Sequence, residues 1–234
     1  MPPVRSYTDW NKRSFDKLEK IEPFKKYFII CEGRNTETFY FKKLIDIRKQ
    51  LNIHNNISII LLEKTGEHEN LSNPHKLIEF AEEQKNNFDL NFDKEHDKMI
   101  IVFDADIFEN KVKGYDELIK NGEKNNILAI TNPSFEIFLL LHIKDAVENV
   151  IIPNYEQIIK NEKIGNSRPA YLYLKEKTGL NSKRNSKIGD LAENVEYAIE
   201  EEKKLNEDIH DCKGKITCNI GKIIQSIKDD NFLY

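Results

Sequence analysis

Apolar residues in the first two thirds of the chain occur as short β-prone runs, each followed by a segment with helical spacing. The runs are Tyr27–Cys31, Ile57–Leu62, Lys98–Phe103 and Asn126–Ile130. Uninterrupted apolar runs of this length are typical of parallel strands that are buried on both faces. Because strand and helix signals alternate, the sequence predicts an α/β, Rossmann-like fold with a mainly parallel four-stranded sheet flanked by helices.

The first helix is expected directly after the first strand, with Asn35 as its N-cap. Four apolar positions then fall on one helical face, namely Tyr40, Leu44, Ile47 and Leu51. Further helices are expected at 74–85 and 114–124, and from Ser134 to Ile143. The last has Asn132 as N-cap and Pro133 at its first position, and it is apolar on nearly every side, which is typical of a buried helix.

The composition changes after Pro153. Residues 154–234 have helical periodicity, strongest over 189–205, with few strand-like runs. We therefore predict an α/β domain over residues 25–150 and a mainly helical C-terminal extension over 151–234 that packs on it. Residues 1–24 are expected to lead into the domain, with apolar positions over 5–21 spaced for a helix.

A hydrophobic fraction of 39% and a charged fraction of 32% describe a soluble globular protein. No run approaches the roughly 18 apolar residues of a membrane span, and the first ten residues lack a secretory signal, so a cytoplasmic location is expected. Cys31, Cys212 and Cys218 are odd in number and lack the spacing of zinc ligands. A net charge of -4 gives no overall attraction to phosphate, although a local basic surface is compatible with it.

Acidic residues follow three of the predicted strands. Glu32 follows the first, Asp104 and Asp106 follow the third, and Glu136 lies in the first turn of the helix after the fourth. Parallel strands bring these ends to one edge of the sheet. Crowded carboxylates raise one another's pKa unless a cation compensates them, and Mg²⁺ or Mn²⁺ binds carboxylates, water and phosphate oxygens. The sequence therefore predicts a divalent-metal site at this edge.

Less specific interpretations apply to the same residues. Acids after strands are often solvated turn residues or helix caps. Glu37 in the first turn of the first helix is expected to act on the helix dipole, and His142 is expected to be a packed residue.

A basic stretch with interleaved aromatic residues follows between residues 168 and 187. It contains Arg168, Lys183, Arg184 and Lys187, with Tyr171 and Tyr173 between them. Cations of this kind neutralise phosphates and tyrosines stack on unpaired bases, which would suit single-stranded or looped nucleic acid. A solvated surface is the alternative reading.

Three segments in order, CEGRNTETFY at 31–40, VFDAD at 102–106 and NPSFEIFLLLH at 132–142, together resemble the RloB family, whose members are similar to the TOPRIM fold. The resemblance covers about residues 25–145. It implies that Glu32 is a general acid or base that also contacts metal, and that Asp104 and Asp106 are the metal-binding pair. The third acid stays open between Glu136 and Glu109.

The resemblance also implies a role for one basic residue and a biological setting. Lys187 would be catalytic, because it stands before the 189–205 helix much as a lysine does in the family. The basic stretch itself predicts that Arg168, Lys183 and Arg184 bind substrate. The chain would be an Mg-dependent endonuclease that cleaves RNA, such as tRNA, or DNA. It would act as the effector of a bacterial anti-phage, abortive-infection system with an ABC-type ATPase as partner.

The alternative is a non-catalytic regulatory or interaction module that partners the ATPase. A receiver-type phosphoacceptor domain is a weaker reading, because Glu32 stands alone after the first strand. No G-x-x-x-x-G-K-[ST] segment is present, so ATP hydrolysis by this chain is not expected. No membrane partner is expected, and homo-oligomerisation is left open.

Overall fold

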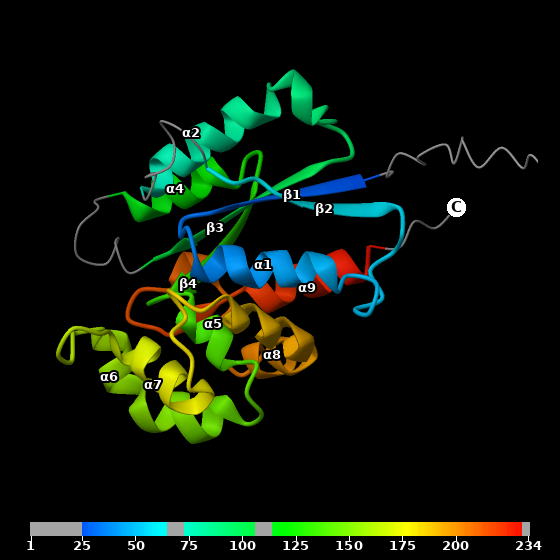
Figure 1. Cartoon of the computed structure of the whole chain (residues 1–234). Coiled ribbons are helices and arrows are strands. Elements are labelled where there is room, and N and C mark those ends of the chain that lie inside the picture. The colour runs from blue at the N-terminus through cyan, green and yellow to red at the C-terminus, as the bar shows by residue number, and fades with distance from the viewer. Residues whose placement is uncertain (1–24, 65–72, 106–113, 231–234) are drawn as a thin grey trace, which may run out of the picture.

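The computed structural model describes residues 25–64, 73–105 and 114–230. Its centre is a five-stranded sheet with the order β2-β1-β3-β4-β5 (Figure 1). The strands are β1 (Lys25–Cys31), β2 (Ile57–Leu61), β3 (Lys98–Asp104), β4 (Ile127–Asn132) and β5 (Thr217–Cys218). The first four pair in parallel and β5 runs antiparallel to β4. The predicted mainly parallel α/β sheet is confirmed, although it has five strands rather than four.

The fifth strand comes from the segment that the sequence predicts to be mainly helical. It is only two residues long, too short to produce a periodic signal. The side chain of Asn219 extends this pairing along the edge of β4. Its oxygen accepts the N–H of Ile130 at 2.7 Å, and its amide donates to the carbonyl of Leu128 at 2.8 Å. One side chain thus replaces the backbone of a longer edge strand.

The helices cover both faces of the sheet. In Figure 1, α2 and α4 lie on one face, and α1, α5, α8 and α9 lie on the other. The α-helices are α1 (Thr36–Asp46), α2 (Pro74–Lys85), α4 (Tyr115–Gly122), α5 (Glu136–Leu140), α6 (Tyr155–Lys160), α7 (Pro169–Thr178), α8 (Val195–Glu202) and α9 (Ile220–Lys228). Shorter helical turns are η2 (Phe88–Leu90), η3 (Val147–Ile151), η4 (Ile152–Asn154), η5 (Ser186–Asn194) and η6 (Ile209–Asp211).

The central positions of the strands are mostly apolar because the sheet separates two hydrophobic cores. Phe28 and Ile30 of β1 pack in the core that contains Leu77 and Phe80 of α2. The alternate residues of β1, such as Ile29, pack in the core formed with α1, α5, α8 and α9. Successive side chains of a strand point to opposite faces, so both faces must be apolar when both are covered.

The fourth strand ends differently from the prediction. Asn132 is the last residue of β4, the Asn132–Pro133 peptide bond is cis, and α5 begins only at Glu136 with Phe135 in the N-cap position. The predicted capping roles of Asn132 and Pro133 are therefore wrong. The physical reason is tertiary, because the Asn132 amide donates to the carbonyls of Cys212 and Lys215 at 2.9 and 2.8 Å. The predicted burial of this helix is confirmed, since all five residues of α5 are buried.

The first helix begins as predicted but ends earlier, at Asp46, so that Ile47 is its C-cap and Leu51 lies in the turns beyond it. The four predicted apolar positions are all buried, being Tyr40, Leu44, Ile47 and Leu51. Asn35 occupies the N-cap position but makes no side-chain cap hydrogen bond, and its amide donates to the carbonyl of Lys183 at 3.0 Å. The helix expected over 189–205 consists of the 3₁₀ segment η5 followed by α8.

The predicted lead-in helix over residues 5–21 lies outside the described residues. The division at residue 150 stays a prediction. Within the part of the chain that the structure describes, no helix combines the length and the apolar character that a membrane span requires.

Candidate functional site

The acids that follow β1 and β3 lie side by side. The N–H of Glu32 donates to the carbonyl of Val102 at 2.8 Å, which extends the pairing of β1 with β3 by one residue. The Oε2 of Glu32 then accepts the N–H of Asp104 at 3.1 Å. The structure therefore brings together two carboxylates that are 72 residues apart in the chain, as the topology of a parallel sheet predicts.

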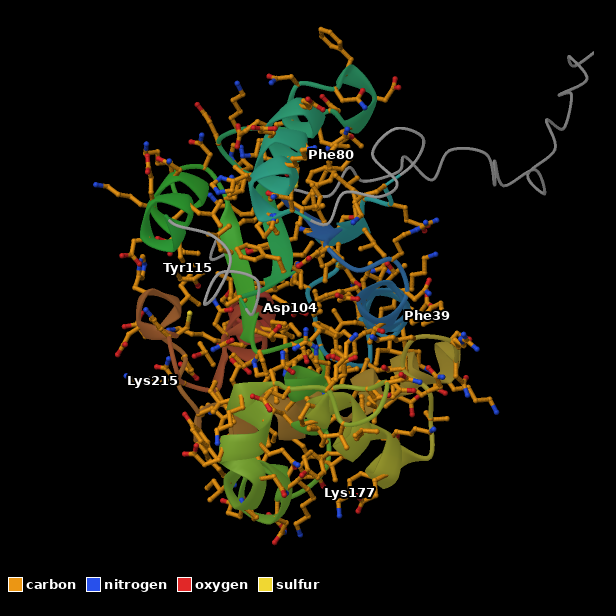
Figure 2. The ribbon with its side chains drawn as sticks, turned by 90° about the vertical axis from the view of Figure 1, so that its left-hand side faces the viewer. Phe39, Phe80, Asp104, Tyr115, Lys177 and Lys215 are labelled. Atoms are coloured by element: carbon orange, nitrogen blue, oxygen red, sulfur yellow. The ribbon has the colours of Figure 1, made fainter. Side chains whose placement is uncertain are left out.

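Asp104 is the last residue of β3, and a residue of β4 donates a hydrogen bond to its carboxylate. Its Oδ1 accepts the hydroxyl of Thr131 at 2.6 Å, and Thr131 is its partner in the strand register and fully buried. In Figure 2, Asp104 lies near the middle of the molecule, between the layer that carries Phe80 and the α7 region that carries Lys177. Burial raises the pKa of Asp104 well above its usual range, and the carboxylates of Glu37 and Glu32 raise it further.

Glu37 belongs to the same group of acids, which the sequence did not indicate. Its side chain is only 9% exposed and lies directly against the turn before α1. An added Cβ on Gly33 would lie 1.9 Å from the Oε2 of Glu37, so the carboxylate fills the space beside that glycine. Burial raises the pKa of Glu37 to about 7 and Glu136 adds to the shift, while backbone hydrogen bonds from Glu37 itself and from Gly33 oppose it. A glycine four residues before an acid, at a strand-to-helix turn, is the signal that could have revealed it.

Glu136, the first residue of α5, is tied to the C-terminal extension. Its Oε1 accepts the hydroxyl of Ser182 at 3.4 Å, and Ser182 is fully buried. The carbonyl of Ser182 in turn accepts the hydroxyl of Thr36 at 3.1 Å. A loop of the extension is therefore fixed both to an acid of the site and to the first turn of α1.

These acids line a single cavity of about 390 Å³. The acids in its wall are Glu32, Glu37, Asp104 and Glu136. The basic and aromatic residues in its wall include Arg34, Arg168, Lys183 and Tyr171. The cavity thus combines acids from the ends of the strands and the starts of α1 and α5 with cations from α7 and the loop that follows it.

The predicted substrate-binding residues divide into two groups. Arg168, whose guanidinium donates to the carbonyl of Asn161, lines the cavity, as does Lys183, whose Nζ lies 5.7 Å from the centre of the Tyr171 ring. Arg184 and Lys187 are exposed and are not among the residues that line it. This position does not match the catalytic role predicted for Lys187. Asp106 and Glu109 lie outside the described residues.

Two further residues bear on the sequence predictions, since the sequence did not indicate the first and described the second correctly. Lys64, which follows β2 and which no motif indicated, donates its ammonium to the carbonyl of Glu32, and burial lowers its pKa. His142, predicted to be a packed residue, is 2% exposed and contacts the hydroxyl of Tyr40 at 2.9 Å. Burial lowers the pKa of His142 to about 4, so it is neutral and structural at physiological pH.

The donor set of the cavity fits a hard divalent cation. Its acids supply oxygen ligands, and like charges raise the pKa of Asp104, as expected where no cation compensates them. Two carboxylates, Glu32 and Asp104, with water in the other positions match the coordination that Mg²⁺ prefers. Among the described residues, the three acids with ligand atoms all within 4.8 Å of one another lie elsewhere, at Asp145, Glu148 and Glu201.

That second acidic group already has a cation. The Nζ of Lys204 lies 2.8 Å from Glu148 and 2.6 Å from Glu201. The backbone N–H of Val147 also donates to Glu201 at 2.9 Å. These contacts give the group a structural explanation without a metal ion.

Comparison with known proteins places the chain in a family. Neither the curated proteins nor the solved structures gave a match. The sequence profile of the RloB-like protein family matches residues 27–227, which includes all three motifs and also the loop that carries Ser182 and Lys183. The chain therefore belongs to the RloB-like protein family, as its three motifs together predict.

Proposed function

We propose that this RloB-like protein is a magnesium-dependent nuclease of TOPRIM type that hydrolyses phosphodiester bonds of RNA or DNA. The observation that carries the proposal is the hydrogen bond from the backbone N–H of Asp104 to the carboxylate of Glu32, because it fixes one acid against the backbone of the other at the carboxyl ends of β1 and β3. Ligands of open α/β sheets bind at this edge, and oxygen donors in this arrangement suit Mg²⁺.

Glu32 and Asp104 would hold the ion, with Asp106 as a third ligand that the family resemblance implies. The bound ion would neutralise charge on the phosphate and lower the pKa of a water molecule. Glu37 lines the same cavity, where its carboxylate would accept the proton of that water as the oxygen bonds to phosphorus. The other phosphorus–oxygen bond then breaks, and the departing oxygen takes a proton from solvent water beside Glu136, which lines the same cavity.

The cations of the cavity give the substrate a second set of contacts. Arg168 and Lys183 lie in the same wall as Tyr171, and phosphate groups beside the reacting one would pair with them. We also propose that the protein is the effector of an anti-phage system and that an ABC-type ATPase controls it, a setting that the family resemblance implies.

A non-catalytic module that partners the ATPase is the second candidate. It is favoured by one observation, namely that no three of the cavity's described acids come within the shared 4.8 Å distance that the Asp145 group shows. Such a module would bind its partner without a divalent ion and would cleave nothing.

The two candidates are separated by incubating the purified full chain, alone and with its ATPase partner, with end-labelled RNA and DNA. Cleavage is expected with Mg²⁺ or Mn²⁺ and not with EDTA, and Glu32→Gln and Asp104→Asn should each reduce it at least about 100-fold. Asp145→Asn is the matched control: it removes one exposed acid of the other group, and Asn tolerates the positive φ of that position. Full cleavage by Glu32→Gln would refute the assignment.

A further inference from the structure

We propose that the cavity beside the acids is a seat for one unpaired nucleotide, with its base against Tyr171 and its phosphate between the acids' metal ion and the cations Arg168 and Lys183. This inference rests on the proposed nuclease function and narrows its substrate to single-stranded or looped nucleic acid. It is carried by the shape of the cavity, the distribution of its charges and the anchoring of Tyr171 and Lys183.

The acids lie at the inner end of a small cavity. Glu37 and Glu136 are 9% and 8% exposed, and Glu32 and Asp104 are half-buried. A volume of about 390 Å³ suits a single small ligand, not a double helix. An unpaired nucleotide can place both its phosphate and its base in a cavity of this size, because its base is not held in a stack.

The cavity has cations on the side away from most of its acids. The acids come from the ends of β1 and β3 and from the starts of α1 and α5, whereas Arg168 is the N-cap of α7 and Lys183 lies in the loop after α7; Arg34 adds a cation from the β1–α1 turn. A phosphate between the two groups would contact a metal ion on one side and cations on the other. No base contact is needed for this step, so it carries no sequence preference.

Tyr171 provides the aromatic surface for the base. It lies in the first turn of α7, lines the cavity, and already has a cation, the Nζ of Lys183, 5.7 Å from its ring centre. A base can stack on a tyrosine ring whatever its identity. Tyr173 is used differently, because its hydroxyl donates to Asn154 at 2.9 Å within the helical extension.

Hydrogen bonds fix the loop that carries Lys183 next to the acids. The amide of Asn35 donates to the carbonyl of Lys183 at 3.0 Å, and Thr36 donates to the adjacent carbonyl of Ser182 at 3.1 Å. The side chain of Ser182 then contacts Glu136 at 3.4 Å. Both walls of the cavity are thus fixed before a ligand binds, as expected of a preformed site.

The test measures binding by the full-length wild-type protein with Ca²⁺ in place of Mg²⁺, using a hairpin with a single 2-aminopurine placed either in its loop or in its stem. We expect fluorescence quenching for the loop probe only, and for a single strand. Tyr171→Ala should weaken loop binding about tenfold, whereas Tyr171→Phe should bind as the parent does. Lys183→Ala should weaken binding and lower the slope of log K against log salt by about one.

Two matched controls lie outside the cavity. Lys177→Ala removes an exposed charge from the far end of α7, which Figure 2 places well away from Asp104, and Tyr173→Phe removes only the remote hydroxyl. Both should bind as the parent does. If Tyr171→Ala does not fold, which thermal melting reveals, Tyr171→Leu against Tyr171→Phe decides the matter, because leucine keeps apolar bulk without an aromatic face.

The results separate this inference from the proposed function. Equal binding of stem and loop probes, or unchanged binding by a folded Tyr171→Ala or Tyr171→Leu variant, would overturn the nucleotide seat and leave the nuclease standing if the wild-type protein cleaves. Selective loop binding without any cleavage by the wild-type protein and its partner would leave the seat standing and overturn the nuclease.

Discussion

The carboxylate of Glu37 occupies the space that a side chain on Gly33 would need, with its Oε2 1.9 Å from the position of an added Cβ. A side chain at this position of the β1–α1 turn would therefore have to displace the end of the Glu37 side chain, which folds back against the turn from four residues later. Gly33 and Glu37 pack against each other, and both line the cavity.

The first prediction concerns this contact. Gly33→Ala should destabilise the protein by about 1–3 kcal/mol, the usual cost of overpacking a fixed site, because the Glu37 carboxylate has to move. In the Glu37→Ala background the same change should cost much less, and the double-mutant cycle measures the difference as a coupling energy. Urea denaturation of the four proteins provides the values. Equal costs in both backgrounds would show that the carboxylate does not lie against Gly33 in solution.

The second prediction concerns pH. The pKa of Glu37 is raised from 4.5 to about 7 by folding, so its protonated form stabilises the folded state. This contribution is fully present below pH 4.5 and is lost as the pH rises through 7, and it amounts to about 3 kcal/mol at most. In EDTA, the free energy of unfolding of the wild-type protein should fall between pH 5 and pH 8 relative to that of Glu37→Gln. Parallel curves for the two proteins would contradict the assigned shift.

The third prediction concerns the metal. Mg²⁺ at about 100 times its dissociation constant should stabilise the folded state by about 2.7 kcal/mol, because only the folded chain brings Glu32 and Asp104 together. Thermal melting with increasing Mg²⁺ measures the shift. Asp104→Asn should abolish it, while Asp145→Asn should keep it, since Lys204 already pairs with the neighbouring acids at that second group. A shift that follows Asp145 instead would place the ion there.

The fourth prediction concerns Lys64. Its ammonium donates to the carbonyl of Glu32, and its charge lowers the pKa of Glu37. Lys64→Met should therefore raise the pH midpoint of kcat/KM, and Lys64→Arg should restore it in part because the charge is retained. A change in KM alone, with an unaltered pH profile, would limit Lys64 to an indirect structural role.

The strands and the meeting of Glu32 with Asp104 were predictable because both follow from local rules. A strand covered on both faces must be apolar throughout, and parallel strands bring their carboxyl ends to one edge. The sequence therefore located these two acids without knowledge of any other contact.

The rest of the site depends on contacts between distant segments. Glu37 looks like an ordinary first-turn acid, and its burial becomes visible only when Gly33 and Glu136 are in place. Ser182 reaches Glu136 from 46 residues away, and nothing in the basic stretch distinguishes Lys183, inside the cavity, from Lys187 outside it. Helical periodicity describes which face is buried but not which loop that face meets.

The loop tied to Thr36 and Glu136 also decides how the chain can be shortened. A fragment that ends with the third motif, near residue 142, would keep Glu32, Glu37, Asp104 and Glu136, yet it would leave Glu136 without Ser182 and strip the apolar surface of α5. The acids of the cavity and the loop that is bonded to them therefore form one structural unit, even though they lie far apart in the sequence.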